Sequence, residues 1–103
     1  MKLMGKAALV TGAGGGLGGA IAKRFAAEGA SVLCTDRDLA KAEFTVTKIT
    51  KDGGTASAFA ANVSEASDCE AQVDETIQRY GRIDIAVNNA GVALHRLALE
   101  TSL

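Results

Sequence analysis

The feature that most constrains this chain is a glycine-rich run of eight residues, TGAGGGLG, at positions 11–18. It follows a short apolar stretch and precedes a stretch whose apolar residues recur every four positions. Five of its residues are glycines, so the backbone can adopt left-handed dihedral angles and bring its N–H groups close to a ligand. A helix starting here directs its unpaired N–H groups at the same place, where an anion is favoured. The run therefore predicts a strand, a phosphate-binding turn and a helix, in that order.

Short apolar runs alternate with longer helical patterns along the chain, without a linker or an internal repeat. The runs predict strands at 7–11, 31–35, 55–60 and 83–88. This alternation is typical of an α/β fold, a Rossmann-type doubly wound parallel sheet, here partial and in the order 3-2-1-4, within one domain of residues 1–103. The apolar helix faces are expected from Leu17, Ile21 and Phe25; from Leu39, Ala42, Val46 and Ile49; and from Ala66, Cys69, Val73, Ile77 and Tyr80.

Polar residues and glycines are expected to mark the helix ends. Asp36 or Asp38 can cap the second helix, and Ser64 can cap the third. Gly29 and Gly81 are expected to end the first and third helices. The β-branched residues 45–47 weaken the helical pattern of the second segment slightly.

Composition excludes several classes of function. The chain has 103 residues, 48% of them hydrophobic, and a net charge of -1, so it offers no basic surface for nucleic acid or an anionic membrane. Cys34 and Cys69 fit no metal or redox spacing and lie in apolar segments, which predicts buried free thiols. No secretory signal or membrane span is expected. We therefore expect a soluble cytoplasmic protein with no metal site.

The glycine spacing alone leaves three readings open. A dinucleotide fingerprint could begin at Gly14, with Gly16 and Gly19; a methyltransferase-like turn could use Gly12, Gly14 and Gly16; and a third pattern uses Gly12, Gly16 and Gly18. The first functional glycine must directly follow the strand. Because position 11 ends the expected strand, the third pattern is favoured.

Asp36 lies at the end of the second expected strand, 18 residues after Gly18. This is close to the spacing of about 20 residues expected for a carboxylate that accepts hydrogen bonds from the adenosine ribose. The charge of Asp36 would repel a 2′-phosphate, so NAD is favoured over NADP, although Arg37 could bind such a phosphate.

Four elements now stand in order at the ends of four expected strands: TGAGGGLG at 11–18, Asp36, the pair Asn62-Val63, and NNAG at 88–91. Together they resemble the classical short-chain dehydrogenases/reductases, whose members are oxidoreductases that use NAD or NADP. The family commonly has Asp where this chain has Asn62, a mild departure because an amide can also bond the adenine edge. The resemblance implies pyrophosphate and ribose contacts from Gly12, Gly16 and Leu17 with Gly18 completing the motif, adenine contacts from Asn62 and Val63, and a cofactor cleft lined by Asn89, Ala90 and Gly91.

The family's catalytic Tyr-x-x-x-Lys pair and its preceding Ser are expected beyond NNAG and are not in this sequence. Tyr80 precedes the fourth expected strand and is expected in the core, and His95 in a loop. We therefore expect no catalytic residue here and an amino-terminal half of a longer enzyme. A fourth helix is expected to begin at position 94, and the exposed edge of the incomplete sheet is expected to cause self-association. A nucleotide-binding module without turnover and an S-adenosylmethionine-dependent methyltransferase are the alternatives; the latter is disfavoured by NNAG. In the full-length family the substrate is a small alcohol or carbonyl compound.

Overall fold

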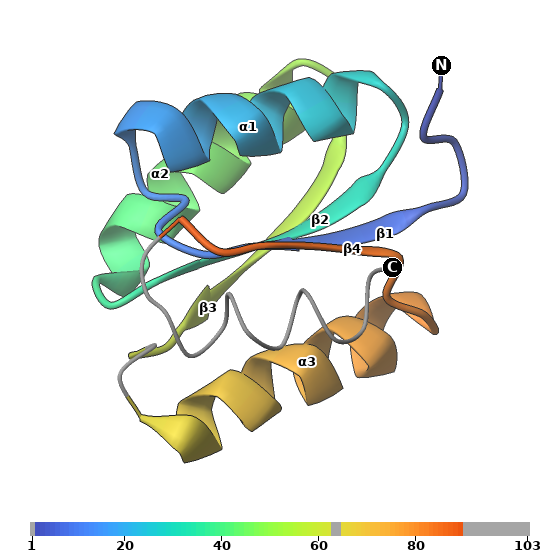
Figure 1. The fold of residues 1–103 in the computed structure, drawn as a ribbon. Helices are drawn as coiled ribbons and strands as arrows, with labels where there is room; N and C mark the ends of the chain where they lie inside the picture. Colours follow the sequence, from blue (N-terminus) through green and yellow to red (C-terminus); the bar gives the residue numbers. More distant parts are fainter. Residues whose placement is uncertain (1, 63–64, 90–103) are drawn as a thin grey trace.

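The computed structural model of the chain describes residues 2–62 and 65–89. Four strands and three helices alternate along this part of the chain. Figure 1 shows how they are arranged in space. In chain order they are β1 (Ala7–Val10), α1 (Gly16–Ala27), β2 (Ser31–Asp36), α2 (Leu39–Lys51), β3 (Thr55–Ala60), α3 (Ala66–Tyr80) and β4 (Ile85–Val87).

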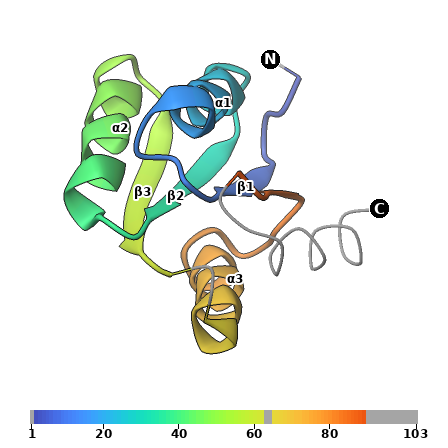
Figure 2. The same ribbon diagram turned by 60° about the vertical axis from the view of Figure 1, so that its left-hand side comes forward.

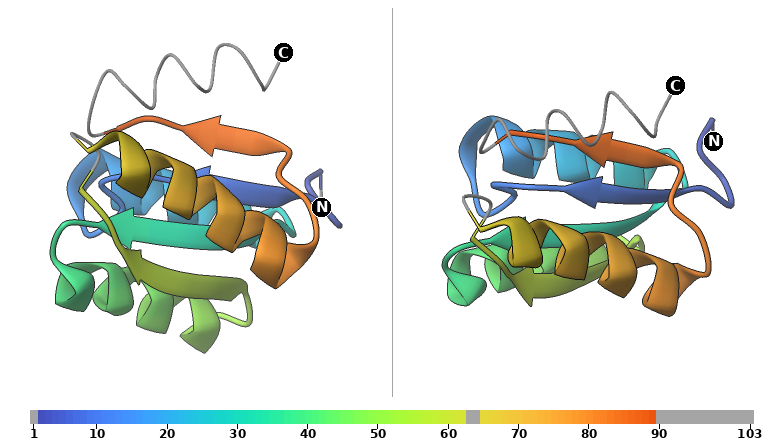
Figure 3. Two further views of the ribbon diagram at one scale, coloured as in Figure 1. Left: turned by 90° about the horizontal axis from the view of Figure 1, so that it is seen from below. Right: turned by 60° about the horizontal axis from the view of Figure 1, so that its bottom comes forward.

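The four strands form one parallel sheet in the order β3-β2-β1-β4. The arrows in Figure 3 all point the same way, with β4 beside β1 at one side of the sheet and β3 at the other. The predicted fold class and strand order are therefore confirmed. Because β2 and β4 lie on opposite sides of β1, the strand order reverses at β1, and a crevice is expected there at the carboxyl ends of the strands.

Helices cover both faces of the sheet. Figure 2 shows α1 and α2 together on one face and α3 alone on the other. Alternate residues of β1 pack on opposite faces of the sheet. Ala8 and Val10 belong to the core beneath α1 and α2, and Leu9 belongs to the core beneath α3. All four β1 residues are buried, as expected of a strand in a sheet that is covered on both faces.

The buried face of α1 differs from the predicted one. Leu17 is 68% exposed, and Ile21 and Phe25 lie at the edge of the core. Small residues face the sheet instead, because they let the helix approach the strands and the preceding turn closely. These buried residues are Gly18, Gly19, Ala22 and Ala26.

The predicted faces of α2 and α3 are also partly wrong. Leu39 is 42% exposed and Ile77 is 44% exposed. Polar residues are buried in α3, because Gln72 and Thr76 find hydrogen-bond partners inside the fold. Tyr80 does contact the core on the α3 side, where its hydroxyl lies 2.9 Å from the Ser57 hydroxyl.

The helix ends match the expected residue types in part. Asp38 caps α2, where its side chain accepts the N–H of Ala40, and Gly81 ends α3 in the left-handed conformation. Glu65 occupies the N-cap position of α3 without a side-chain bond, and Ser64 lies outside the described residues. Both cysteines are buried thiols that form no disulfide. Within the described part of the chain, no helix is long and apolar enough to cross a membrane.

Candidate functional site

The glycine-rich turn joins β1 to α1 at the carboxyl edge of the sheet, as predicted. Gly12 and Gly16 have φ values of 60° and 55°, in the left-handed region that favours glycine. The turn is bonded to the ends of the neighbouring strands: the Thr11 N–H donates to the Val87 carbonyl of β4, and the Ala13 N–H donates to the Thr35 carbonyl of β2. The turn therefore lies across the point where the strand order reverses.

The amino end of α1 leaves backbone donors available. The N–H groups of Gly16, Leu17 and Gly18 belong to the first helical turn, where no helical carbonyl is available, and no acceptor for them occurs among the described residues. Gly19 is the first residue to donate back to the turn, to the Gly15 carbonyl. Because residues 15–17 are exposed, this cluster of N–H groups is open to an anionic ligand.

Two glycines of the run are required by close packing. A Cβ on Gly18 would lie 2.1 Å from the Gly12 carbonyl oxygen and 2.7 Å from the Asn89 amide nitrogen. A Cβ on Gly14 would lie 2.5 Å from the Lys41 Cβ and 2.6 Å from a carboxylate oxygen of Asp36. Gly18 was predicted as a site residue, whereas Gly14 was not, because its neighbours lie on β2 and α2, far away in sequence.

Asp36 ends β2 beside the glycine turn. Its Oδ2 accepts the Gly14 N–H at 3.1 Å and its Oδ1 accepts the Asp38 N–H at 3.0 Å. An ionised carboxylate has about four acceptor positions, so each oxygen keeps one for a further donor such as a ribose hydroxyl. Arg37 follows it and is exposed.

The end of β3 lies next to the end of β2. The Ala61 N–H donates to the Asp36 carbonyl, and the Asn62 N–H donates to the carboxylate of Asp68 in the first turn of α3 at 2.8 Å. This places Asn62 on the Asp36 side of the crevice. Val63, predicted beside it, lies outside the described residues.

A buried polar network behind this edge was missed by the sequence analysis. Gln72 of α3 is fully buried, its Oε1 accepts the Thr35 hydroxyl at 2.5 Å, and its amide donates to the Asp68 carbonyl. The network connects the end of β2 with the helix turn that holds Asn62. A glutamine at an apolar helix position was the only signal in the sequence.

Asn89 follows β4 and bonds to the glycine turn. Its N–H donates to the Thr11 hydroxyl at 3.0 Å, and its side-chain amide donates to the Gly12 carbonyl at 3.3 Å. Asn88 lies beside Thr11, with its Oδ1 at 3.5 Å from the Thr11 hydroxyl. Ala90 and Gly91 lie outside the described residues. The structure thus brings Gly12, Gly18 and Asn89 together.

Burial shifts the pKa of two potential proton donors, Cys34 and Tyr80. Burial raises the pKa of the Cys34 thiol to about 12, so it stays protonated at neutral pH. Burial also raises the pKa of Tyr80, which is the opposite of what a proton-transferring tyrosine needs. No group of metal-ligating side chains occurs within residues 2–62 and 65–89.

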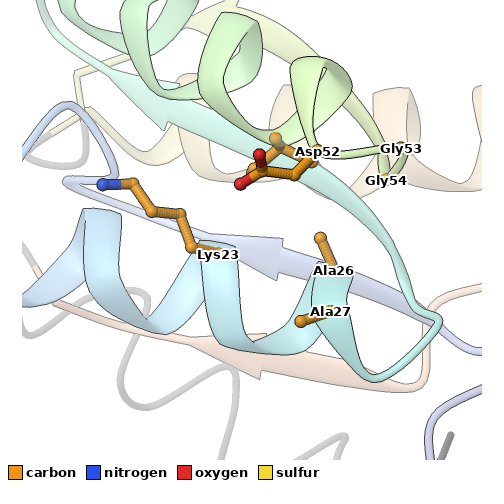
Figure 4. A pocket seen from close by; sticks show the side chains of 7 residues that line it. Lys23, Ala26, Ala27, Asp52, Gly53 and Gly54 are labelled. Atoms are coloured by element: carbon orange, nitrogen blue, oxygen red, sulfur yellow. The ribbon is translucent and has the colours of Figure 1, made fainter.

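A pocket of about 130 Å³ lies between the carboxyl ends of α1 and α2. Figure 4 shows Lys23 from α1 and Asp52 from the end of α2 on its two sides, with Gly53 and Gly54 nearby. A neighbouring pocket shares Ala26 and these glycines and extends to Thr55 at the start of β3. Both therefore lie at the opposite edge of the sheet from the glycine turn, and neither is the predicted site.

Comparison with known proteins agrees with this geometry. The sequence model of the family described as short chain dehydrogenase matches residues 6–103. The chain belongs to this family. It is 42% identical over 102 residues to a D-threitol dehydrogenase of Mycolicibacterium smegmatis, covering 99% of this chain and 39% of that protein.

Solved structures of short-chain dehydrogenases have the same arrangement. A hydroxysteroid dehydrogenase from Escherichia coli superposes with a TM-score of 0.85 at 41% identity, over 87% of this chain and 38% of that one. A metagenomic short-chain oxidoreductase in complex with NADP gives a TM-score of 0.83 at 37% identity, over 88% and 41% of the two chains. The chain therefore spans about two-fifths of the length of the relatives it matches, and the short-chain dehydrogenase fold is shared throughout the matched part.

Proposed function

We propose that residues 1–103 are the dinucleotide-binding domain of an NAD(P)-dependent oxidoreductase. The observation that carries this proposal is the cluster of N–H groups at residues 16–18 that have no acceptor among the described residues. They lie beside the exposed residues 15–17, at the point where the strand order reverses. Membership of the short-chain dehydrogenase family supports it, as does the NADP bound by one structural relative. The proposed cofactor residues are Gly12, Gly16, Leu17, Gly18, Asp36, Arg37, Asn62, Val63, Asn89, Ala90 and Gly91.

NAD is proposed as the preferred cofactor. Each carboxylate oxygen of Asp36 accepts one backbone N–H, which fixes the orientation of the side chain. Each oxygen can accept one more hydrogen bond, which suits the two ribose hydroxyls. A 2′-phosphate placed there would meet the carboxylate charge. Arg37 is the residue through which NADP would be accommodated, since its guanidinium can bind a phosphate.

Hydride transfer is proposed to need residues beyond these 103. The cofactor supplies the hydride chemistry, and the protein must supply a positioned proton donor for the substrate oxygen. The sequence has no Tyr-x-x-x-Lys pair, and Tyr80 is engaged with Ser57 and Val32. We therefore expect the chain by itself to bind cofactor without turnover. In the complete enzyme we propose a small alcohol or carbonyl substrate, a cytoplasmic location and a homo-oligomer.

Calorimetry with NAD, NADP and S-adenosylmethionine tests this assignment. We expect NAD to bind more tightly than NADP, and S-adenosylmethionine not to bind. Asp36→Ala should weaken NAD binding roughly tenfold to a hundredfold, because hydrogen bonds to a charged group contribute about 1.5–3 kcal/mol, and should bring NAD and NADP closer in affinity.

The control for that variant is Asp52→Ala, which removes a carboxylate at the opposite edge of the sheet. It should leave NAD affinity unchanged. Tighter binding of S-adenosylmethionine than of either nicotinamide cofactor would overturn the proposal, and an unchanged NAD to NADP ratio in Asp36→Ala would overturn the role of Asp36.

A further inference from the structure

One buried hydroxyl outside the proposed cofactor residues is bonded to the glycine turn. Thr45 lies in the middle of α2 and is 2% exposed, and its Oγ1 donates to the Ala13 carbonyl at 2.6 Å. The neighbouring Thr47 and Thr50 instead donate to carbonyls of α2 itself. Thr45 is therefore a helix residue whose hydroxyl reaches the turn that precedes α1.

The bond from Thr45 acts on one peptide group together with Asp36. The Ala13 carbonyl and the Gly14 N–H belong to the same planar peptide, so their directions are fixed relative to each other. The carbonyl accepts from Thr45, and the N–H donates to Asp36 Oδ2 at 3.1 Å. The preceding peptide is held by the bond from the Ala13 N–H to the Thr35 carbonyl. Side chains from β2 and α2 thus set the orientation of this peptide from both ends.

Loss of the hydroxyl would leave the Ala13 carbonyl without its donor in a residue that is fully buried. A buried carbonyl without a donor is unfavourable, and rotation of the peptide toward water relieves it. Gly14 permits such a rotation because it has no side chain. Residues 15–17 are the adjacent exposed part of the turn and lead into the N–H groups of residues 16–18. A carbonyl dipole turned toward them would oppose the binding of a diphosphate.

We propose that Thr45 is a positioning residue for the dinucleotide, which holds the Ala13–Gly14 peptide so that the turn presents N–H groups rather than a carbonyl to the pyrophosphate. This inference rests on the proposed function. It assigns to the middle of α2 a part in diphosphate binding, although Thr45 itself is buried away from the ligand.

The test compares adenosine, ADP and NAD as ligands of the 103-residue chain by calorimetry. Thr45→Val removes the hydroxyl at nearly constant shape, and we expect it to weaken ADP and NAD roughly tenfold while changing adenosine affinity less than about twofold. Thr45→Ser keeps the hydroxyl and should restore the affinities. Thr47→Val is the matched control, because Thr47 is exposed on the same helix and has no bond to the turn.

A purely structural role for Thr45 would lower the affinity for all three ligands in parallel, and that result would overturn the proposal. If Thr45→Val does not fold, Thr45→Ala serves in the same comparison. A failure of both to fold while Thr45→Ser folds would likewise overturn the selective role. A wild-type chain that binds neither ADP nor NAD contradicts the proposed function itself, and this inference falls with it.

Discussion

Gly18 and Gly19 are adjacent, both buried, and differ in what a side chain would meet. A Cβ on Gly18 would overlap the Gly12 carbonyl at 2.1 Å, whereas one on Gly19 would lie 3.4 Å from the Ala13 carbonyl and 3.6 Å from the Thr45 hydroxyl. The first distance is a clash with backbone, and the second two are ordinary contacts. Alanine substitutions at the two positions therefore distinguish the steric requirement for glycine at position 18 from the general effect of a substitution in this helix.

We expect Gly18→Ala to destabilise the chain by about 1–3 kcal/mol and to disrupt the turn, because backbone must shift to admit the methyl group. Gly19→Ala should be neutral or stabilising by up to about 1 kcal/mol, since alanine is the better helix former. Urea unfolding of the two variants, monitored by circular dichroism, measures this difference. Equal effects of the two substitutions would contradict the packing argument.

At the scale of elements, the start of β1 is attached to the loop before β4 by a side chain. The Asp84 carboxylate accepts a hydrogen bond from the Ala7 N–H at 2.8 Å. It also forms a bidentate ion pair with Arg82, in which the guanidinium Nε and Nη2 each lie 2.8 Å from a carboxylate oxygen. Arg82, and then the Ala7 N–H, hold the pKa of Asp84 below its usual range. These contacts favour the ionised form in the folded chain, so the contribution of Asp84 to stability depends on pH.

Because the pKa of Asp84 is lower in the folded than in the unfolded chain, its stabilisation is complete above about pH 4 and is lost as the pH falls through the lower, folded value. We expect the free energy of unfolding to fall less between about pH 6 and about pH 2 in Asp84→Asn than in the wild type. Urea unfolding across this range measures it. Glu43→Gln, at an exposed position of α2, is the control and should follow the wild type; identical pH profiles for Asp84→Asn and the wild type would refute the role of Asp84.

The order of the elements could be predicted from the sequence, because β1 and β2 are buried on both faces and so appear as continuous apolar runs. The helix faces could be predicted only in part. Periodicity favoured Leu17 and Ile77, whereas close contact selected Gly18 and a satisfied hydrogen bond selected Gln72. The position of a candidate site residue was predictable where that residue ends a strand, as Asp36 does. It was not predictable where a partner comes from another element, as Thr45 does.

At the scale of the whole molecule, the described residues form a sheet with β4 at its edge. Within them β4 pairs with β1 alone, and its three residues are only half-buried. Parallel sheets normally bury such strands, and an unpaired strand edge can pair with another chain.

We therefore predict that the 103-residue chain self-associates in solution, and light scattering should give a mass above that of a monomer. Ala86→Lys places a charge on the edge strand and should reduce this association. Ala20→Lys, at an exposed position of α1, is the matched control and should not. A folded chain that is monomeric at all concentrations would contradict this prediction.

We claim that the glycine turn of this short-chain dehydrogenase chain binds a nicotinamide dinucleotide, and a titration with NAD followed by the amide NMR signals examines that binding residue by residue. We predict that the amide signals of Gly12, Gly16, Leu17 and Gly18 shift with increasing NAD, together with those of Asp36 and Asn89. Gly53 and Gly54, at the opposite edge of the sheet, should not shift. Saturable shifts confined to Gly53 and Gly54, or no shifts at the turn at millimolar NAD, would contradict the claim.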